Sequence, residues 1–360
     1  MGLPKEVIII PMIKFLNDSI AEKYRGKTCL LRIDLNTESG IPLDSYRLEA
    51  VLPTIKLLLK NKVKVIILSH RGRPDSFDKK FSLRPFVRVS CMKLGRKVNF
   101  LVDFDFPKIK NRIEKSKPGS VFLLENLRFL PGEEKNDIKL AKRLASLGDF
   151  YVNDAFAVSH RKNASVCAIT KYLPSYGGLL LEKEIKNLGG ILKYITRPLI
   201  IILGGAKLKE KILKLKKMIG KADSVLLGSN AFNESGIPEE PKFVWPDDAR
   251  KNGKFIWDIG PFTVNSYADL INEAGTIIWN GPPGLFEKKG FEKGTIGIWK
   301  AVLSNRKAKI IIGGGETIAS LSLIHNSKFI IPRNLFISTG GGAMLEYLNG
   351  KKLPGIEALK

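Results

Sequence analysis

The sequence has few of the residues that build metal centres or disulfide frameworks. Only three cysteines and three histidines occur among 360 residues. Cys29, Cys91 and Cys167 are odd in number and too scattered for metal-ligand spacing. We therefore expect reduced thiols, and neither a zinc site nor a Cys/His nucleophile pair.

Long apolar runs are missing as well. No run approaches the ~20 residues that a helix needs to cross a bilayer. The apolar patch at residues 7–12 is too short for a secretory core and lacks a small-residue cleavage site. The 44% apolar content is typical of a globular protein, and the length suffices for two domains. We expect a cytoplasmic protein without a membrane partner.

Acidic residues are too few to balance the basic ones. The chain has 60 Lys+Arg against 35 Asp+Glu, a formal charge of +25. Such an excess favours anionic partners, which include nucleic acid, membrane surfaces and phosphorylated metabolites, although on charge alone a lysine-rich solvated surface is the better explanation. The lysines are spread along amphipathic stretches, and no zinc finger, RNP-like motif or low-complexity basic segment is present. We therefore expect no specific binding of nucleic acid.

Apolar strand-like runs alternate with amphipathic helical stretches along the chain. This alternation predicts an α/β fold with parallel sheets, in which ligands bind at the carboxyl ends of the strands. The stretch 179–194 predicts a helix that connects two domains. Predicted strands cover residues 29–33, 63–68, 121–124, 150–152, 199–203, 225–227, 276–279 and 310–312, and predicted helices cover 47–60, 138–147 and 207–219.

In the first half, basic side chains follow the predicted strands. Guanidinium groups are forked, permanently charged donors that suit carboxylate and phosphate oxygens, so the group predicts a small anionic ligand. Asp34 and Asn36 either bind a hydroxyl or order the arginines, and Asp34 could simply neutralise its basic neighbours. The basic group consists of Arg47, His70, Arg73, Arg128 and Arg161.

In the second half, three apolar runs end in glycine clusters, at Gly204-Gly205, Gly313 to Gly315 and Gly340 to Gly342. Glycines at such ends allow the close approach of a phosphate, and the following helix N-termini attract anions. Lys207 and Lys211 follow the first cluster on one helix face. Neither GxxxxGK[ST] nor GxGxxG is present. Glu316 is either a magnesium ligand or a carboxylate that satisfies a helix dipole.

Taken in order, these motifs resemble the phosphoglycerate kinase family from about Arg32 to Leu359. The resemblance implies two doubly wound, Rossmann-like parallel-sheet domains joined by a hinge helix. Residues 1–184 would bind 3-phosphoglycerate, residues 185–344 would bind nucleotide, and a tail of about 345–360 would return to the first domain. The motifs are residues 32–36, 69–74, 124–129, 131–134, 152–156, 203–207, 279–282 and 338–343.

The resemblance further implies reversible phosphoryl transfer between 1,3-bisphosphoglycerate and ADP, giving 3-phosphoglycerate and ATP with Mg²⁺. Domain closure and electrostatic stabilisation would drive it, and we expect a monomer. The implied substrate residues are Asp34, Asn36, Arg47, His70, Arg73, Arg128 and Arg161. The implied nucleotide residues are Gly205, Lys211, Asn280, Glu287, Gly314, Gly315, Glu316 and Thr317, with Glu316 on the metal. The implied catalytic residues are Arg47, Lys207, Lys211 and Gly315.

The chain departs from the family pattern mainly on the nucleotide side. Glu316 replaces an aspartate, and its additional methylene shifts the carboxylate by roughly 1.5 Å. The segment 229–257 is shorter than in the family, and a helix is missing from it. Asn163 and Leu130 stand where the family usually has histidine. Glu316 and the shortened segment favour the alternative of a catalytically impaired relative that binds a metabolite or a partner, whereas the intact basic residues and Glu287 favour an active enzyme.

Overall fold

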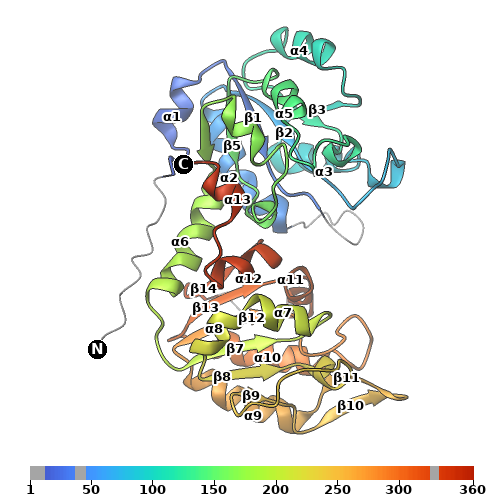
Figure 1. Ribbon diagram of the computed structural model, residues 1–360, viewed down its shortest axis with the longest axis vertical. Helices are drawn as coiled ribbons and strands as arrows, with labels where there is room; N and C mark the ends of the chain where they lie inside the picture. The colour runs from blue at the N-terminus through green and yellow to red at the C-terminus, as the bar shows by residue number, and fades with distance from the viewer. Residues whose placement is uncertain (1–12, 37–45, 325–331) are drawn as a thin grey trace. The chain divides into compact units, whose positions relative to one another are not determined.

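The computed structural model describes residues 13–36, 46–324 and 332–360, so the apolar patch at 7–12 lies outside the described residues. The chain forms two compact units. One extends to Ile185 and includes Lys352–Lys360, and the other comprises Lys186–Lys351. Each unit is built on one six-stranded sheet (Figure 1).

The sheet of the first unit has the order β3-β4-β2-β1-β5-β6, and all its pairs are parallel. The central strand β1 pairs with β2 on one side and with β5 on the other, so later strands lie on both sides of it. In doubly wound sheets this arrangement opens a crevice at the carboxyl ends of the central strands. The strands are β1 (Thr28–Arg32), β2 (Lys64–Leu68), β3 (Val98–Leu101), β4 (Val121–Leu124), β5 (Phe150–Asn153) and β6 (Ser175–Gly177).

Both faces of this sheet are covered. On one face, Leu31, Ile67 and Leu123 share a core with residues of α2 and α3 (bounds below). The alternate residues Leu30 and Phe122 are buried outside that core, as expected for parallel strands between two helical layers. The helices of this unit are α1 (Asp18–Lys23), α2 (Tyr46–Lys60), α3 (Phe86–Leu94), α4 (Phe106–Glu114), α5 (Ile138–Ala145) and α13 (Pro354–Glu357).

The second unit repeats this construction with the strand order β14-β13-β12-β7-β8-β9. Its core contains the fully buried pair Trp279 and Trp299, whose ring centroids are 4.5 Å apart. The strands are β7 (Leu199–Leu203), β8 (Ser224–Leu227), β9 (Phe243–Val244), β12 (Thr276–Asn280), β13 (Lys309–Gly313) and β14 (Leu335–Ile337). The helices are α7 (Leu208–Lys214), α8 (Lys216–Lys221), α9 (Pro261–Glu273), α10 (Lys293–Ser304), α11 (Gly315–Ala319) and α12 (Gly342–Leu348).

The segment from β8 to β11 contains no α-helix, and all of its residues are described. A 3₁₀ turn, Ser229–Phe232, follows β8. The antiparallel strands β10 (Ala249–Asn252) and β11 (Phe255–Ile259) then form a separate two-stranded sheet. The Asn233 side chain fixes this hairpin, because its Nδ2 donates to Ile256 O at 2.5 Å and its Oδ1 accepts from Ile256 N at 3.1 Å.

One helix, α6 (Leu179–Lys193), carries the chain from the first unit into the second (Figure 1). Asp154, which follows β5, accepts a hydrogen bond from Leu181 N at 2.9 Å and so caps this helix. A Cβ atom on Gly178 would lie 2.3 Å from the Asp154 carboxyl carbon, which explains the glycine. Burial raises the pKa of Asp154 to about 7, although Thr54 and two backbone amides oppose the shift.

The end of the chain returns to the first unit. Gly355 N donates to Ser159 O at 2.8 Å, and Asn153 Nδ2 donates to Gly355 O at 3.2 Å. In Figure 1, α13 is drawn in red beside β5 and α6. Residues about 200 positions apart in the sequence therefore fold as one unit.

The predicted fold class, two parallel α/β sheets with a connecting helix, is confirmed. The prediction of one helix over 207–219 is wrong, because the chain turns at the buried residue Leu215 and forms α7 and α8. Strands β3 and β6 of the first unit and β9, β10 and β11 of the second unit were not predicted. The β3 sequence Val98-Asn99-Phe100-Leu101 has no continuous apolar run, since two of its four residues are only half-buried at the sheet edge.

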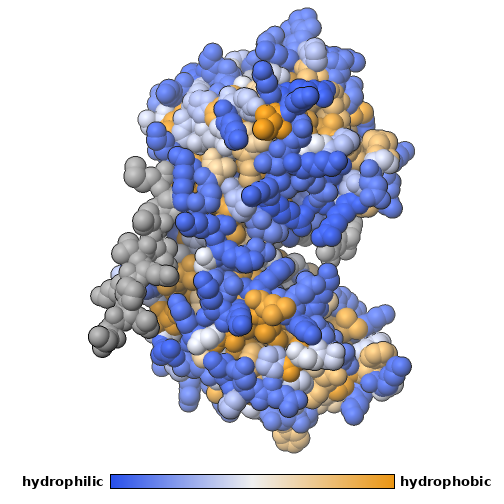
Figure 2. All heavy atoms as spheres, viewed as in Figure 1, coloured by the Kyte–Doolittle hydropathy of each residue, from blue (hydrophilic) through white to orange (hydrophobic). Residues whose placement is uncertain are grey.

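None of the described helices combines the length and the apolar character needed to span a bilayer. The three cysteines form no disulfide, as predicted. Figure 2 shows a face on which hydrophilic side chains predominate and apolar patches are scattered, in keeping with the abundance of lysine and arginine.

Replacing Asp154 by asparagine should change how stability depends on pH. Folding raises this pKa from 3.8 to about 7, so between these values the folded protein holds a proton that the unfolded chain has lost. The wild type should therefore lose stability as the pH rises through this window, by at most ~1.4 kcal/mol per pH unit, and Asp154→Asn should lack that contribution. Urea unfolding of both proteins at several pH values measures it. Parallel pH profiles would contradict the assignment.

Candidate active site

The carboxyl edge of the first sheet holds a buried histidine among arginines. His70, after β2, is 3% exposed, and its Nδ1 lies 3.3 Å from Nη2 of the buried Arg32. A guanidinium group only donates, so Nδ1 accepts and the neutral ring carries its proton on Nε2. Burial, and then the charges of Arg32, Arg128, Arg161 and Arg47, hold the pKa of His70 well below its usual value. His70 is therefore an uncharged donor.

Asp34 and Arg47 form the central ion pair of this edge. Arg47 Nη1 lies 2.5 Å from Asp34 Oδ2 and donates to Asn36 O at 2.6 Å. Asp34 Oδ1 accepts from Asn36 N at 3.0 Å, and Asn36 Oδ1 accepts from Gly72 N at 2.8 Å. Of the roles considered for Asp34, the ordering of an arginine is therefore present in the structure.

Arg128, Arg161 and Arg73 complete the basic group. Arg128 follows β4, and its Nη2 lies 3.1 Å from Glu134 Oε1, while its Nε is buried without a hydrogen-bond partner. Burial lowers the pKa of Arg128, which Glu134 partly offsets and the neighbouring arginines reinforce. Arg161 is half-buried and donates from Nε to His160 Nε2 at 3.3 Å, whereas Arg73 is exposed. All the predicted basic residues thus belong to one edge.

A buried hydrogen-bond network behind this edge was not predicted. Arg32 Nε donates to Ser165 Oγ at 3.0 Å, and Ser165 Oγ donates to Glu133 Oε1 at 2.6 Å. Asn163 is also buried and donates to Glu133 Oε1 at 3.3 Å. The signal in the sequence was the charge of Arg32 at the end of an apolar strand.

At the carboxyl edge of the second sheet, glycine loops pack backbone against backbone. Gly204 N donates to Asn280 O at 3.2 Å, and Gly205 N donates to Pro282 O at 2.8 Å. A Cβ atom on Gly281, whose φ is +96°, would lie 1.9 Å from Gly204 O. Side chains are excluded where the Gly204 and Gly281 backbones meet, so backbone amides line this part of the edge. The side chains that belong to the edge lie around this contact.

Lys211 and Glu316 flank the Gly205 backbone. Lys211 Nζ donates to Gly204 O at 2.7 Å. A Cβ atom on Gly205 would lie 2.3 Å from Glu316 Oε2 and 3.3 Å from Lys211 Nζ. Burial lowers the pKa of Lys211, and Glu316 and Glu234 oppose that shift. An ammonium group and a carboxylate thus face the same glycine turn.

The N-terminus of α7 differs from its prediction as an anion site. Leu208 N and Lys209 N donate to the two carboxylate oxygens of Glu234, at 2.9 and 3.0 Å. The protein's own carboxylate thus occupies this helix end. Lys207 precedes the helix in a left-handed conformation and is exposed.

The remaining predicted nucleotide residues lie on the β12 and β13 loops. Asn280 is 3% exposed, and its Nδ2 has no acceptor within the protein although it lies beside Gly314. The Thr317 hydroxyl accepts from Gly281 N at 2.7 Å and donates to Gly313 O at 3.0 Å, so it is engaged inside the loop. Gly315 is exposed and begins α11. Glu287 is also exposed and lies in the connection between β12 and α10.

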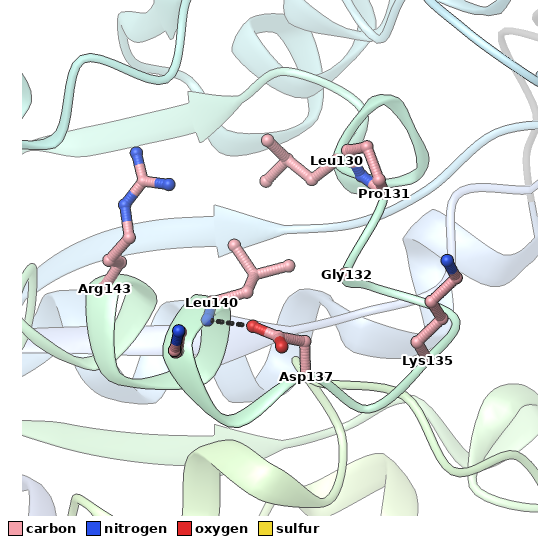
Figure 3. Close-up of a pocket in the computed structure, with 8 residues that line it drawn as sticks. Leu130, Pro131, Gly132, Lys135, Asp137, Leu140 and Arg143 are labelled. Atoms are coloured by element: carbon pink, nitrogen blue, oxygen red, sulfur yellow. Dashed lines mark hydrogen bonds between the residues drawn. The ribbon is translucent and has the colours of Figure 1, made fainter.

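A separate cavity of about 340 Å³ lies in the first unit, beside the N-terminus of α5 (Figure 3). Asp137 caps that helix by accepting from Leu140 N at 2.6 Å. Leu130 lines this cavity, and none of the predicted site residues does. The lining residues are Leu130, Pro131, Gly132, Lys135, Asp137, Lys139, Leu140 and Arg143.

The described residues contain no cluster of three or more metal-ligating side chains. Glu316 instead stands as a single carboxylate at the glycine turn. Mg²⁺ commonly takes one or two carboxylates together with substrate phosphates and water. Glu316 is therefore compatible with a magnesium ion that a nucleotide brings with it.

Comparison with known proteins gives consistent matches. The phosphoglycerate kinase family model matches residues 18–234 and 229–351. A phosphoglycerate kinase of Dictyoglomus turgidum is 38% identical, covering 96% of this chain and 99% of its own length. That of Gloeobacter violaceus is 35% identical, covering 94% and 97%. The alignment with the first relative spans 396 positions, so part of it has no counterpart in these 360 residues.

Solved structures agree with these matches. The crystal structure of phosphoglycerate kinase from Pyrococcus horikoshii superposes with a TM-score of 0.83 at 31% identity, covering 93% of this chain and 96% of that one. The structure from Coxiella burnetii gives 0.72 at 32% identity, covering 92% and 96%. The fold and these matches define an α/β phosphotransferase enzyme. More particularly, the chain belongs to the phosphoglycerate kinase family, which confirms the resemblance seen in the motifs.

Replacing Gly281 by alanine should disrupt the glycine edge. The new Cβ would meet backbone atoms of Gly204, and the φ of +96° adds strain, so we expect a loss of several kcal/mol, more than the ~1–2 kcal/mol of a left-handed residue alone. Gly290→Ala is the matched control, because its φ is +95° and nothing lies within 4 Å of its Cβ position. Urea unfolding compares the two variants, and equal losses would show that the close approach is unimportant.

Proposed function

We propose that this protein catalyses reversible phosphoryl transfer between 1,3-bisphosphoglycerate and ADP, giving 3-phosphoglycerate and ATP. The observation that carries the proposal is the group of buried and half-buried cations around neutral His70 at one sheet edge. Family membership supports the same assignment.

The edge of the first sheet would bind the phosphoglycerate. Arg47, Arg128 and Arg161 supply permanent charge, and exposed Arg73 extends it. Neutral His70 and the Asn36 amide would recognise polar groups of the ligand without adding charge, and the Asp34 carboxylate would accept a hydrogen bond from a ligand hydroxyl. Asp34 keeps Arg47 in place through their 2.5 Å contact, which lowers the entropy lost when the ligand binds.

The edge of the second sheet would bind the nucleotide. Asn280 Nδ2 is a buried donor without an acceptor, and a buried polar group of this kind is costly unless a ligand satisfies it. Gly205, Gly314 and Gly315 would let phosphates approach the backbone, and Thr317 would keep that turn in shape. Glu287 would contact the nucleotide from the rim.

Glu316 would hold Mg²⁺, which neutralises phosphate charge when it is bound. Phosphoryl transfer of this kind needs alignment and positive charge more than proton transfer. The acceptor in the reverse direction is a carboxylate, which is already ionised at neutral pH, so no general base is required. Arg47, Lys207, Lys211 and the Gly315 amide would supply the charge and the hydrogen bonds. The lowered pKa of Lys211 leaves its ammonium less strongly protonated than an exposed one, and Glu316 helps to retain the proton.

We further propose that the enzyme acts as a monomer in the cytoplasm, with phosphorylated metabolites as its anionic partners. Closure of the two units about α6 stays a prediction. The alternative of a catalytically impaired relative has little support, because Glu316 reaches the Gly205 turn beside Lys211 despite its added methylene.

A coupled assay of ATP consumption with 3-phosphoglycerate and Mg²⁺ tests this function. We expect the wild type and Glu316→Asp to turn over, and Glu316→Gln to lose about tenfold or more because the metal ligand is lost. Should neither of the first two turn over while both still bind 3-phosphoglycerate, the enzymatic proposal is wrong. Activity in Glu316→Asp alone would locate the defect at the metal site.

Arg47→Ala should lower kcat by about a hundredfold or more, with a smaller change in the KM for 3-phosphoglycerate, if the guanidinium stabilises the transition state. Lys56→Ala on the same helix is the control, because Lys56 is exposed on the far part of α2. Steady-state kinetics separate the two effects. A rise in KM at constant kcat would instead assign Arg47 to substrate binding alone.

A further inference from the structure

A buried carboxylate holds the loop that follows the glycine edge of the second unit. Residues 285–292, here termed the Glu287 loop, connect the turn that follows β12 to α10. Asp258, at the end of β11, is fully buried. Its Oδ2 accepts from Gly294 N at 2.8 Å, and its Oδ1 accepts from Ile259 N at 2.9 Å. One carboxylate therefore joins β11 to the first turn of α10.

The same carboxylate hydrogen-bonds to Gly294 at one end of the Glu287 loop and lies close to the Gly284 backbone at the other. Cβ atoms on Gly284 and Gly294 would lie 1.9 and 2.3 Å from Asp258 Oδ1, so only glycine fits at either position. The neighbouring backbone strengthens this attachment, because Leu285 N donates to Trp257 O at 2.7 Å. The Glu287 loop is thus anchored at its start and at its end, while Glu287 between them is exposed.

An aromatic contact also holds the Glu287 loop against β11. The rings of Trp257 and Phe291 pack edge to face with centroids 5.0 Å apart. Trp257 directly precedes Asp258. Two adjacent residues of β11 therefore hold the Glu287 loop, Trp257 by its ring and its carbonyl oxygen and Asp258 by its carboxylate. These contacts lie on both sides of Glu287 in the sequence, so they constrain the backbone that carries its exposed carboxylate.

We propose that Asp258 is a positioning residue for the nucleotide: it fixes both ends of the Glu287 loop and thereby sets the affinity for ADP without touching it. This inference rests on the proposed function, in which Glu287 contacts the nucleotide. Asp258 directly follows the segment 229–257, and Trp257, which also contacts the Glu287 loop, is the last residue of that segment.

The charge of Asp258 makes the attachment sensitive to pH. Burial raises its pKa to about 7, while the amides of Gly294 and Ile259 and the charge of Arg250 on β10 lower it, and Glu292 before α10 raises it. A protonated carboxyl has less capacity to accept two amide hydrogens. The hold on the Glu287 loop therefore weakens as the pH falls through about 7.

Calorimetric titration of the full-length protein with ADP and Mg²⁺ tests the inference. Asp258→Asn should raise the Kd for ADP by about fivefold or more, since one amide loses a charged acceptor, and the KM for 3-phosphoglycerate should stay unchanged. The matched control is Asp248→Asn. Asp248 caps α9 in the same unit by accepting from Thr263 N at 2.8 Å and Phe262 N at 3.1 Å, so this variant should lose stability and keep its ADP affinity.

The pH dependence provides a second arm. The ratio of the two Kd values, Asp258→Asn over wild type, should shrink as the pH falls from about 8 to 6, because protonation weakens the wild type alone. Arg250→Gln leaves Asp258 in place and removes a charge that lowers its pKa, so the affinity loss of this variant should begin at a higher pH. If Asp258→Asn does not fold, the pH dependence of the ADP affinity of Arg250→Gln still tests the positioning role of Asp258.

The outcomes are distinguishable. Wild type that binds no ADP contradicts the proposed function itself. Wild type that binds ADP, with Asp258→Asn equal to Asp248→Asn in affinity, overturns the positioning role alone. An unchanged pH midpoint in Arg250→Gln likewise overturns it.

Discussion

Parallel strands covered on both faces are the constraint on which the rest of this structure depends. Every residue of β1, β2, β7 and β12 is buried, so the sheets offer no face to a ligand. Parallel pairing brings all the strand ends of a sheet to one edge. Polar residues that follow strands far apart in the sequence are therefore neighbours, and each unit places its polar groups on such an edge.

The two edges use this constraint in opposite ways. The first stores positive charge in long side chains and holds them with carboxylates, such as Asp34 for Arg47 and Glu134 for Arg128. The second excludes side chains where Gly204 and Gly281 touch, so that backbone amides take their place. Forked guanidinium groups suit a compact carboxylate and phosphate, whereas a glycine edge suits a chain of phosphates.

The sequence predicted these edges well because the evidence was local. A strand of apolar residues followed by Arg, His or Gly needs no knowledge of the fold beyond strand polarity. The partners that hold the edges are distant in sequence and gave no local signal. Glu234 at the start of α7 and Asp258 beneath the Glu287 loop are examples, because each acts through backbone amides of another element. The break at Leu215 was missed because the helical pattern of residues 207–219 continues through it without a proline or glycine at the turn.

Glu316 illustrates how a longer side chain can be accommodated at such an edge. Its Oε2 comes so close to the Gly205 backbone that any side chain there would collide with it, and Gly205 also has a positive φ of +64°. An aspartate would end roughly 1.5 Å short of this point. The carboxylate then opposes the loss of the Lys211 proton that burial promotes. The added methylene therefore does not leave the acid outside the turn, because Gly205 has no side chain and so leaves room for the longer carboxylate beside Lys211.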